Sequence, residues 1–318
     1  MDGDARLQVP PVIREATPTA PYSLRAPSPP HISVPVLTRS VNQGQEFFHM
    51  VPSTAYIDAS HLTTHDFYTI TRNTTQYATD RAASWSYAQR RNAQSILDFL
   101  YLGPTSIVRD HGFLRDEGIT MIVVVRDTRM GATPLMSVTR AAEALGLQVY
   151  YVNIDGLHQL IGGLSAIIRD LNNHLLQVYR ESEASGAAER RRGKILVSCD
   201  TGNDRSAAVV CAYIMTMFGN DLLTTLQFVS IQRFCCTFDE DIKRMLQTYG
   251  DILRARAAVA ADEHTTKYHN APIIAKNTKR GFDSTVDVDM DSPDTEDSNP
   301  DVLRFNGRQS FAPFADTD

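Results

Sequence analysis

Several features that would define other classes of protein are missing from this sequence of 318 residues. It has no run of about 18 apolar residues, so we expect no membrane-spanning helix. It has four cysteines, which is too few for a disulfide framework in a chain of this length. The start, MDGDARLQVPP, lacks a basic segment and an apolar core. We therefore expect no secretory signal, reduced thiols, and a location in the cytoplasm and nucleus.

Proline and charge are distributed unevenly along the chain. Eight of the 15 prolines lie in the first 35 residues, and residues 283–301 contain eight acids and no base. The net charge of −6 is therefore a property of the C-terminal tail and predicts no acidic folded surface and no nucleic-acid partner. Segments of this composition bury too little apolar surface to offset the entropy of ordering. The predicted organisation is a disordered Pro/Ser-rich tail (1–45), a partly ordered extension (46–81), one domain (82–257) and a disordered acidic tail (258–318).

Within residues 82–257, apolar runs typical of strands alternate with segments that have helical periodicity. The predicted strands cover 95–103, 119–125, 148–154 and 194–198, and the first of them has a possible bend at Asp98. The predicted helices cover 138–145, 160–180, 206–218, 221–231 and 240–257. This alternation predicts an α/β domain with a mostly parallel central sheet flanked by helices. The run Arg190-Arg191-Arg192 is interpreted as a solvated loop in preference to a nuclear signal or a patch for an anionic partner.

The junction between the strand KILVS and the next helix carries the chemistry. It reads Cys199-Asp200-Thr201-Gly202-Asn203-Asp204-Arg205-Ser206, and we call residues 199–205 the phosphate loop. A tight turn into a helix N-terminus directs several N–H groups and a partial positive charge into one concavity. Gly202 permits the turn, Arg205 can hold two phosphate oxygens, and Cys199 lies where a nucleophile would. The Cys-x5-Arg spacing therefore predicts that residues 199–205 bind a tetrahedral oxyanion beside a thiol.

Three segments around this loop carry a resemblance to a known family. They are WSYAQRRNAQSILDFLYLGP (85–104), DEGITMIVVVR (116–126) and GNDRSAAVVCAYIMTMFGNDLLTTLQFVSIQRFC (202–235). The chain resembles the dual-specificity protein phosphatases and, within them, the STYX-type (phosphoserine/threonine/tyrosine-interacting) pseudophosphatases. The resemblance implies the dual-specificity phosphatase fold, with no metal and no other cofactor. It also implies phosphorylated proteins, MAP kinases or F-box ubiquitin-ligase proteins as partners.

The chain departs from this family at positions that matter for catalysis. Active relatives carry His before the nucleophile, where this chain has Ser198, which offers the thiolate no charge. STYX-type proteins lose the nucleophilic Cys, whereas Cys199 remains here. The general acid of active relatives would fall near Leu157, so Asp155 is two residues early and His158 is one late. We interpret Asp155 as a turn residue and His158 as a solvated one, with acid catalysis by either as the alternative.

Two carboxylates within the phosphate loop are a further departure. Asp200 and Asp204 would repel a phosphate dianion if they point inward, and would be close to neutral in effect if they point outward. An Asp directly before the Arg also occurs in loops resembling those of myotubularin and Sac lipid phosphatases, where a loop carboxylate can act as the acid. Asp204 is therefore a second candidate for the general acid.

Two functional hypotheses follow. In the first, the domain is a binding module in which Arg205, the loop amides and Ser206 hold a phosphorylated residue, or the loop shapes a surface for a kinase or ligase adaptor, with negligible turnover. In the second, Cys199 attacks phosphorus to form a phosphocysteine, Asp204 or Asp155 protonates the leaving oxygen, and Ser206 assists hydrolysis. The missing His and the displaced Asp favour the first hypothesis, whereas the intact Cys and Arg favour the second.

Overall fold

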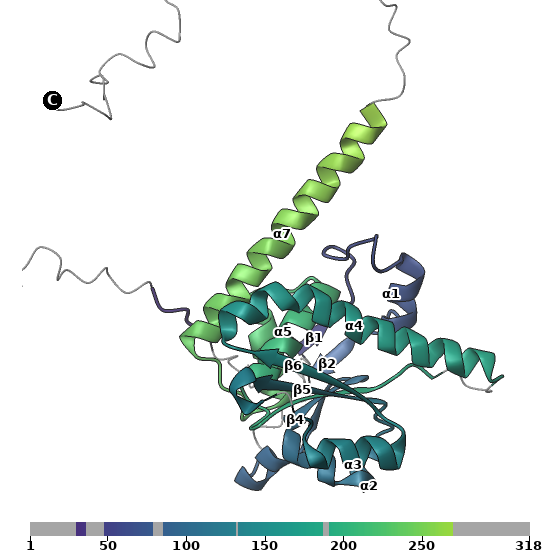
Figure 1. Ribbon diagram of the computed structural model, residues 1–318. Helices are drawn as coiled ribbons and strands as arrows, with labels where there is room; N and C mark the ends of the chain where they lie inside the picture. The colour runs from purple at the N-terminus through teal and green to yellow at the C-terminus, as the bar shows by residue number, and fades with distance from the viewer. Residues whose placement is uncertain (1–29, 36–47, 79–84, 132, 187–190, 270–318) are drawn as a thin grey trace, which may run out of the picture. The chain divides into compact units, whose positions relative to one another are not determined.

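The structure is a computed structural model, shown in Figure 1. It describes residues 30–35, 48–78, 85–131, 133–186 and 191–269. Most of both predicted tails, 1–45 and 258–318, lies outside the described residues. Residues 187–190 also lie outside them, and these include Arg190, the first of the three consecutive arginines.

A five-stranded sheet forms the centre of the domain (Figure 1). Its strands, in spatial order, are β3 (Gln94–Leu97), β4 (Leu100–Pro104), β7 (Ile195–Cys199), β5 (Met121–Asp127) and β6 (Gln148–Ile154). The pairs β4–β7, β7–β5 and β5–β6 are parallel, and only β3–β4 is antiparallel. The dense β-branched run of β5 is buried on both faces of the sheet, which is typical of a central parallel strand. The predicted mostly parallel sheet is confirmed.

The segment 95–103, predicted as one strand with a possible bend at Asp98, forms two strands, because the chain reverses at Asp98 and makes the β3–β4 hairpin. Asp98 accepts a hydrogen bond from Gln76 Nε2 at 3.0 Å, and its own N–H donates to Gln76 Oε1 at 3.0 Å. A residue 22 positions away therefore stabilises the turn, and local alternation of apolar residues could not reveal it.

Helices cover both faces of the sheet. Their bounds are α2 (His111–Asp116), α3 (Met136–Leu145), α4 (Leu157–Ala184), α5 (Arg205–Phe218), α6 (Leu222–Gln232) and α7 (Glu240–His269), with short 3-10 turns η3 (Tyr87–Arg91), η4 (Thr105–Arg109) and η5 (Thr128–Met130).

Successive side chains of β5 point to opposite faces of the sheet and so contribute to two separate cores. Val123 and Val125 pack in the cluster that includes α4 to α7, whereas Ile122 and Val124 pack with α2 and α3. Gly146 ends α3 in the left-handed conformation, as expected for a C-cap glycine.

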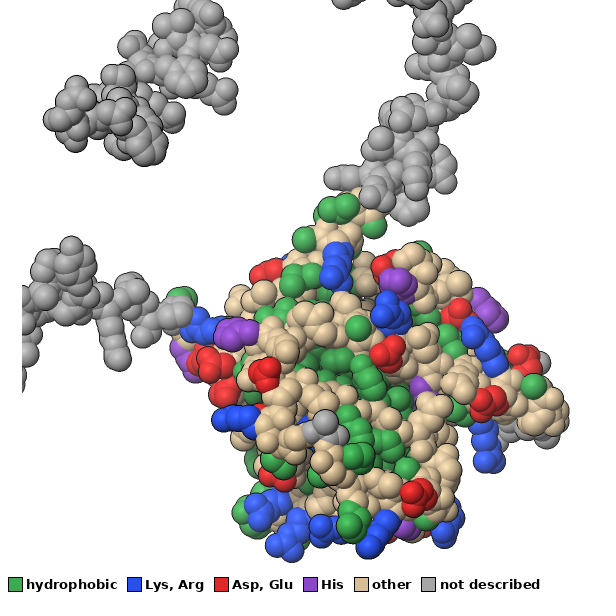
Figure 2. All heavy atoms as spheres, viewed as in Figure 1, with side chains coloured by type: hydrophobic (Ala, Val, Ile, Leu, Met, Phe, Trp, Pro, Cys, Tyr) green, Lys and Arg blue, Asp and Glu red, His purple; other side chains and the backbone are tan. Residues whose placement is uncertain are grey.

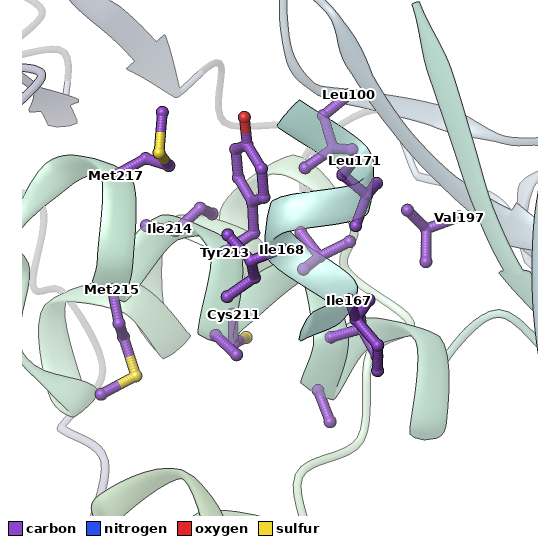
Figure 3. Packing of buried hydrophobic residues seen from close by; sticks show 14 of the residues in the cluster. Leu100, Ile167, Ile168, Leu171, Val197, Cys211, Tyr213, Ile214, Met215 and Met217 are labelled. Atoms are coloured by element: carbon purple, nitrogen blue, oxygen red, sulfur yellow. The ribbon is translucent and has the colours of Figure 1, made fainter. Parts of the chain in front are cut away.

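Helix α5 lies at the centre of the larger core. Every residue from Ser206 to Phe218 is buried, which explains why its sequence is apolar all round. Figure 3 shows Cys211, Tyr213 and Ile214 of α5 next to Ile168 and Leu171 of α4. Because α5 is surrounded by packed side chains, its first turn is held firmly at the end of β7.

The N-terminal extension packs on the helical face. Strands β1 (Phe48–Met50) and β2 (Gln76–Ala78) pair antiparallel, and helix α1 (Thr64–Thr71) lies between them in sequence. Further upstream, the N–H of Ile32 donates to Glu240 Oε2 at 3.1 Å, and Lys243 Nζ donates to the Ile32 carbonyl at 2.7 Å. Residues 30–35, which belong to the predicted N-terminal tail, therefore have described contacts with the start of α7. Helix α7 also continues to His269, twelve residues beyond its predicted end at Ala257.

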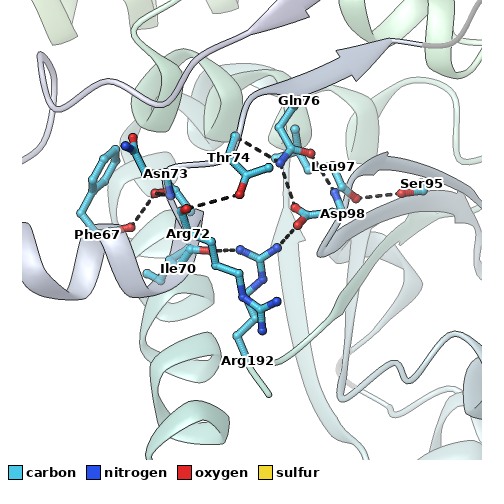
Figure 4. Close-up of polar contacts among 11 residues, drawn as sticks. Phe67, Ile70, Arg72, Asn73, Thr74, Gln76, Ser95, Leu97, Asp98 and Arg192 are labelled. Atoms are coloured by element: carbon cyan, nitrogen blue, oxygen red, sulfur yellow. Dashed lines mark hydrogen bonds and ion pairs between the residues drawn. The ribbon is translucent and has the colours of Figure 1, made fainter. Parts of the chain in front are cut away.

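Arg192 connects this extension to the hairpin, as Figure 4 shows. Its guanidinium donates to the carbonyl of Ile70 at the end of α1 and pairs with Asp98 at the β3–β4 turn, and it lies over the ring of Phe99. Burial lowers the pKa of Arg192. The interpretation of Arg190–Arg192 as a solvated loop is wrong for Arg192, which is buried, whereas Arg191 is exposed and residue 190 lies outside the described residues.

The surface in Figure 2 shows acidic and basic side chains interspersed around the rim of this face, with hydrophobic side chains towards its middle. Among the described residues, the helices are all too short or too polar to cross a membrane.

Replacing Asp98 with Ala should destabilise the fold, because it leaves the buried Arg192 guanidinium without its carboxylate. We expect a loss of about 2 kcal/mol in the free energy of unfolding, below the usual cost of breaking a fully buried pair because the Asp98 side chain is 43% exposed. The control is Arg180→Ala, which breaks the more exposed pair with Asp66 and should cost about 0.5 kcal/mol. Equal effects of the two substitutions in urea denaturation would contradict this assignment.

Candidate functional site

The phosphate loop lies at the carboxyl end of β7, where α5 begins. In the parallel pairing, Pro104 of β4 lies opposite Cys199. Ligand sites of open α/β sheets form at this edge, outside the carboxyl ends of the strands. The fold therefore places residues 199–205 where the sequence predicted a site.

Gly202 allows the loop to turn tightly against β4. Its φ of +73° is in the left-handed region, and a Cβ at this position would lie 2.3 Å from the carbonyl carbon of Gly103. Two separate features therefore require glycine at position 202. One is the left-handed backbone conformation, and the other is the close approach of the loop to β4.

The thiol of Cys199 is buried and has three close polar neighbours. The Gly202 N–H donates to Sγ at 3.2 Å and the Ser206 hydroxyl donates to Sγ at 3.0 Å. Sγ itself lies 3.0 Å from Asp204 Oδ1 and donates to it. A carboxylate oxygen only accepts, so this contact needs the proton of the thiol.

Asp204 points into the loop, and the same Oδ1 atom accepts two more hydrogen bonds. The donors are the N–H of Arg205 at 2.7 Å and the hydroxyl of Thr201 at 3.3 Å. Burial raises the pKa of Asp204, but the hydrogen bonds from Cys199 and from the Arg205 N–H, with the charge of Arg205, leave that pKa below its ordinary value. The carboxyl group is therefore ionised at neutral pH, and it could donate a proton only after accepting one.

The two loop carboxylates differ in exposure. Asp200 is exposed, whereas Asp204 is half-buried, so of the two loop carboxylates only Asp204 lies next to the thiol. The Arg205 side chain is partly exposed, and among the described residues it forms no side-chain hydrogen bond with the loop.

The remaining acid candidates lie apart from Cys199. Asp155 and His158 are exposed, and the N–H of Asp155 donates to Gln159 Oε1 at 2.7 Å in the turn before α4. Asp127, which the sequence analysis did not consider as an acid, ends β5, and its pKa is lowered to about 2, chiefly by hydrogen bonds from the side chain and N–H of Arg129. In the described part of the chain, neither Asp155 nor His158 makes a contact with the thiol.

Ser198, in the place of the family's His, is fully buried. Its hydroxyl donates to the Val123 carbonyl at 3.0 Å and lies 3.3 Å from the hydroxyl of Thr105, which donates to it. Ser198 therefore connects β7 to β5 and η4, and none of its described hydrogen bonds reaches Sγ.

Arg233 is a residue of this site that the sequence analysis missed. It follows α6, is 1% exposed, and donates from Nε to the Gly202 carbonyl at 2.9 Å and from Nη2 to Asn203 Oδ1 at 3.0 Å. On its other side it donates to the carbonyls of Asn92 and Arg90 at 2.8 and 3.0 Å. The guanidinium thus ties the outer part of the loop to the segment before β3. The sequence signal was weak, because one Arg after an amphipathic helix usually lies in solvent.

No group of three or more His, Cys, Asp or Glu side chains in the described ranges is arranged to hold a metal ion.

The strand–loop–helix geometry and the Cys-x5-Arg spacing agree with the resemblance described from the sequence. Residues 171–252, which include the loop, match the family model "Dual specificity phosphatase, catalytic domain". The chain therefore has a dual-specificity-phosphatase-like fold, and the resemblance predicted from the sequence is confirmed.

Two relatives and one solved structure are similar to this chain. The chain is 28% identical over 184 residues to the serine/threonine/tyrosine-interacting protein of Mus musculus, covering 57% of this chain and 74% of the relative. The protein of that name from Homo sapiens is 28% identical over 182 residues, covering 56% and 73%. The crystal structure of a human tyrosine phosphatase-like protein of this name gives a TM-score of 0.39 at 26% identity, covering 51% of this chain and 97% of that one.

Replacing Gly202 with Ala should disrupt the loop, because the new Cβ would collide with the backbone of Gly103 and favour a negative φ. We expect a loss of about 2 kcal/mol or more in the free energy of unfolding. The matched control is Gly162→Ala in α4, where a Cβ meets nothing within 4 Å and the helix should gain about 1 kcal/mol. A neutral Gly202→Ala in thermal or urea unfolding would show that the close approach is not required.

Proposed function

We propose that this protein is a phosphatase-fold regulator that binds phosphorylated proteins through the phosphate loop and turns them over negligibly. The observation that carries the proposal is the contact of Cys199 Sγ with Asp204 Oδ1 at 3.0 Å. A nucleophile for phosphorus must be a thiolate, whereas here the sulfur lies against a carboxylate oxygen, whose negative charge opposes a second negative charge on sulfur.

The surroundings of the thiol support the same proposal. The position before Cys199 holds a serine whose hydroxyl is directed to the Val123 carbonyl, so it supplies no charge to a thiolate. Asp155 and His158, the two candidates beside the family's acid position, are both exposed. A leaving oxygen would therefore lack a positioned proton donor, and general acid catalysis contributes typically 10²–10⁴-fold to such reactions, roughly.

The class of partner is proposed from similarity and from the chemistry of the loop. The relatives are named for interaction with serine, threonine and tyrosine. Arg205 and the helix N-terminus suit a phosphate group on such a residue. We propose phosphorylated Tyr, Ser or Thr segments of MAP-kinase-type or F-box proteins as partners, in the cytoplasm and nucleus.

A second candidate function is that of an active cysteine-dependent phosphatase. It is favoured by the Gly202 N–H and the Ser206 hydroxyl, which both donate to Sγ and would stabilise a thiolate. Asp204 would take the thiol proton and return it to the leaving oxygen, so that one carboxyl group would serve both steps.

Hydrolysis of a small aryl phosphate by the full chain and by Cys199→Ser distinguishes these functions. We expect the two proteins to show equal, background rates, because the wild-type sulfur lies beside the Asp204 carboxylate and no described side chain is positioned as a general acid. Turnover that Cys199→Ser abolishes would contradict the proposal and establish the phosphatase.

Binding of a phosphotyrosine peptide, followed by fluorescence anisotropy, tests the other half of the proposal. Arg205→Ala should weaken binding about tenfold or more, since a charge-assisted hydrogen bond is lost. Arg254→Ala is the matched control, because Arg254 lies on α7 and pairs with Asp251. Equal binding by both variants would exclude the loop as the binding site.

A further inference from the structure

Several hydrogen-bond donors of the phosphate loop are directed to groups of the loop itself. The N–H of Gly202 donates to Cys199 Sγ, that of Asn203 to Thr201 Oγ1 at 3.2 Å, and that of Arg205 to Asp204 Oδ1. The Thr201 hydroxyl and the Cys199 thiol also donate to Asp204 Oδ1. One carboxylate oxygen therefore receives three donors of different kinds.

These donors are of the kind that an oxyanion would need. A phosphate bound in such a loop takes backbone N–H groups at the start of the helix, with the charge of the arginine and the dipole of α5 behind them. Asp204 is the N-cap of α5 and half-buried, and its negative charge lies within the influence of the Arg205 guanidinium. The loop thus already contains an anion bound to it.

We propose that the Asp204 carboxylate is an internal ligand of the phosphate loop and determines which ligands the loop accepts. An incoming phosphate must displace this carboxylate and break its contacts with Arg205, Thr201 and Cys199. If the carboxylate stays, a phosphate dianion lies beside a like charge in a partly buried site.

This inference rests on the proposed function and specifies its ligand. A free tetrahedral oxyanion gains too little to displace Asp204, so the loop binds it weakly. A phosphorylated segment of a protein partner brings additional contacts outside the loop, and these supply the free energy that moves the carboxylate. The loop is accordingly selective for phosphate presented on a folded or extended partner.

Binding of tungstate, a tetrahedral oxyanion, to the full chain by calorimetry tests the inference. Asp204→Ser removes the charge and keeps a residue type that caps helices well, so the helix start is retained. We expect it to bind tungstate at least about tenfold more tightly than wild type. Asp204→Asn keeps an oxygen for the Arg205 N–H and should fall between the two. If neither variant differs from wild type by more than about threefold, the inference is wrong.

The charge-matched comparison is Asp200→Asn, which removes the same formal charge from an exposed position of the same loop. Its gain should stay below about threefold, because exposed charges are screened. A gain equal to that of Asp204→Ser would attribute the effect to net charge and overturn the inference. Failure of the proposed function appears separately, as aryl phosphate turnover that depends on Cys199.

Discussion

The close approach of Gly202 to the Gly103–Pro104 backbone is the constraint on which the phosphate loop depends. It is possible because both Gly202 and Gly103 lack a side chain, and a Cβ on Gly103 would itself lie 2.7 Å from Ala93 Cβ. The buried Arg233 holds the outer side of the loop by its carbonyls. Between these two restraints the loop has little freedom, so the direction of each N–H group is fixed before any ligand arrives.

Within this rigid loop, the Asp204 side chain determines how much positive charge faces a ligand. The N-terminus of α5 and Arg205 provide positive charge, as in a site for phosphate. The carboxylate of Asp204 cancels part of that charge and accepts a hydrogen bond from the Cys199 thiol. A loop with the composition of a catalytic site can therefore favour binding over turnover, without loss of its cysteine or arginine.

Much of the fold could be predicted from the sequence because local patterns determine it. The β-branched run of β5, the all-apolar α5 and the Gly146 cap each carry their signal within a few residues. At Asp98 the sequence indicated only a possible bend, because the full β3–β4 reversal depends on contacts of Asp98 with Gln76 and with Arg192.

The location of the candidate site could also be predicted from the sequence, but the orientation of its side chains could not. The spacing of Cys199 and Arg205 located the loop, and the sequence identified its two carboxylates as a departure from the family. It left their orientation open, because an Asp side chain points inward or outward according to which N–H groups the folded loop directs to it. The role of Arg233 was hidden for a similar reason, as its acceptors come from two segments more than 100 residues apart in the chain.

A crystal structure of the full chain, grown at neutral pH without added oxyanion, tests the central claim most directly. We predict that Asp204 Oδ1 lies within hydrogen-bond distance of both Cys199 Sγ and the Arg205 N–H. An Asp204 side chain turned to solvent, with the loop N–H groups open around an unpartnered Cys199 Sγ, would contradict the account.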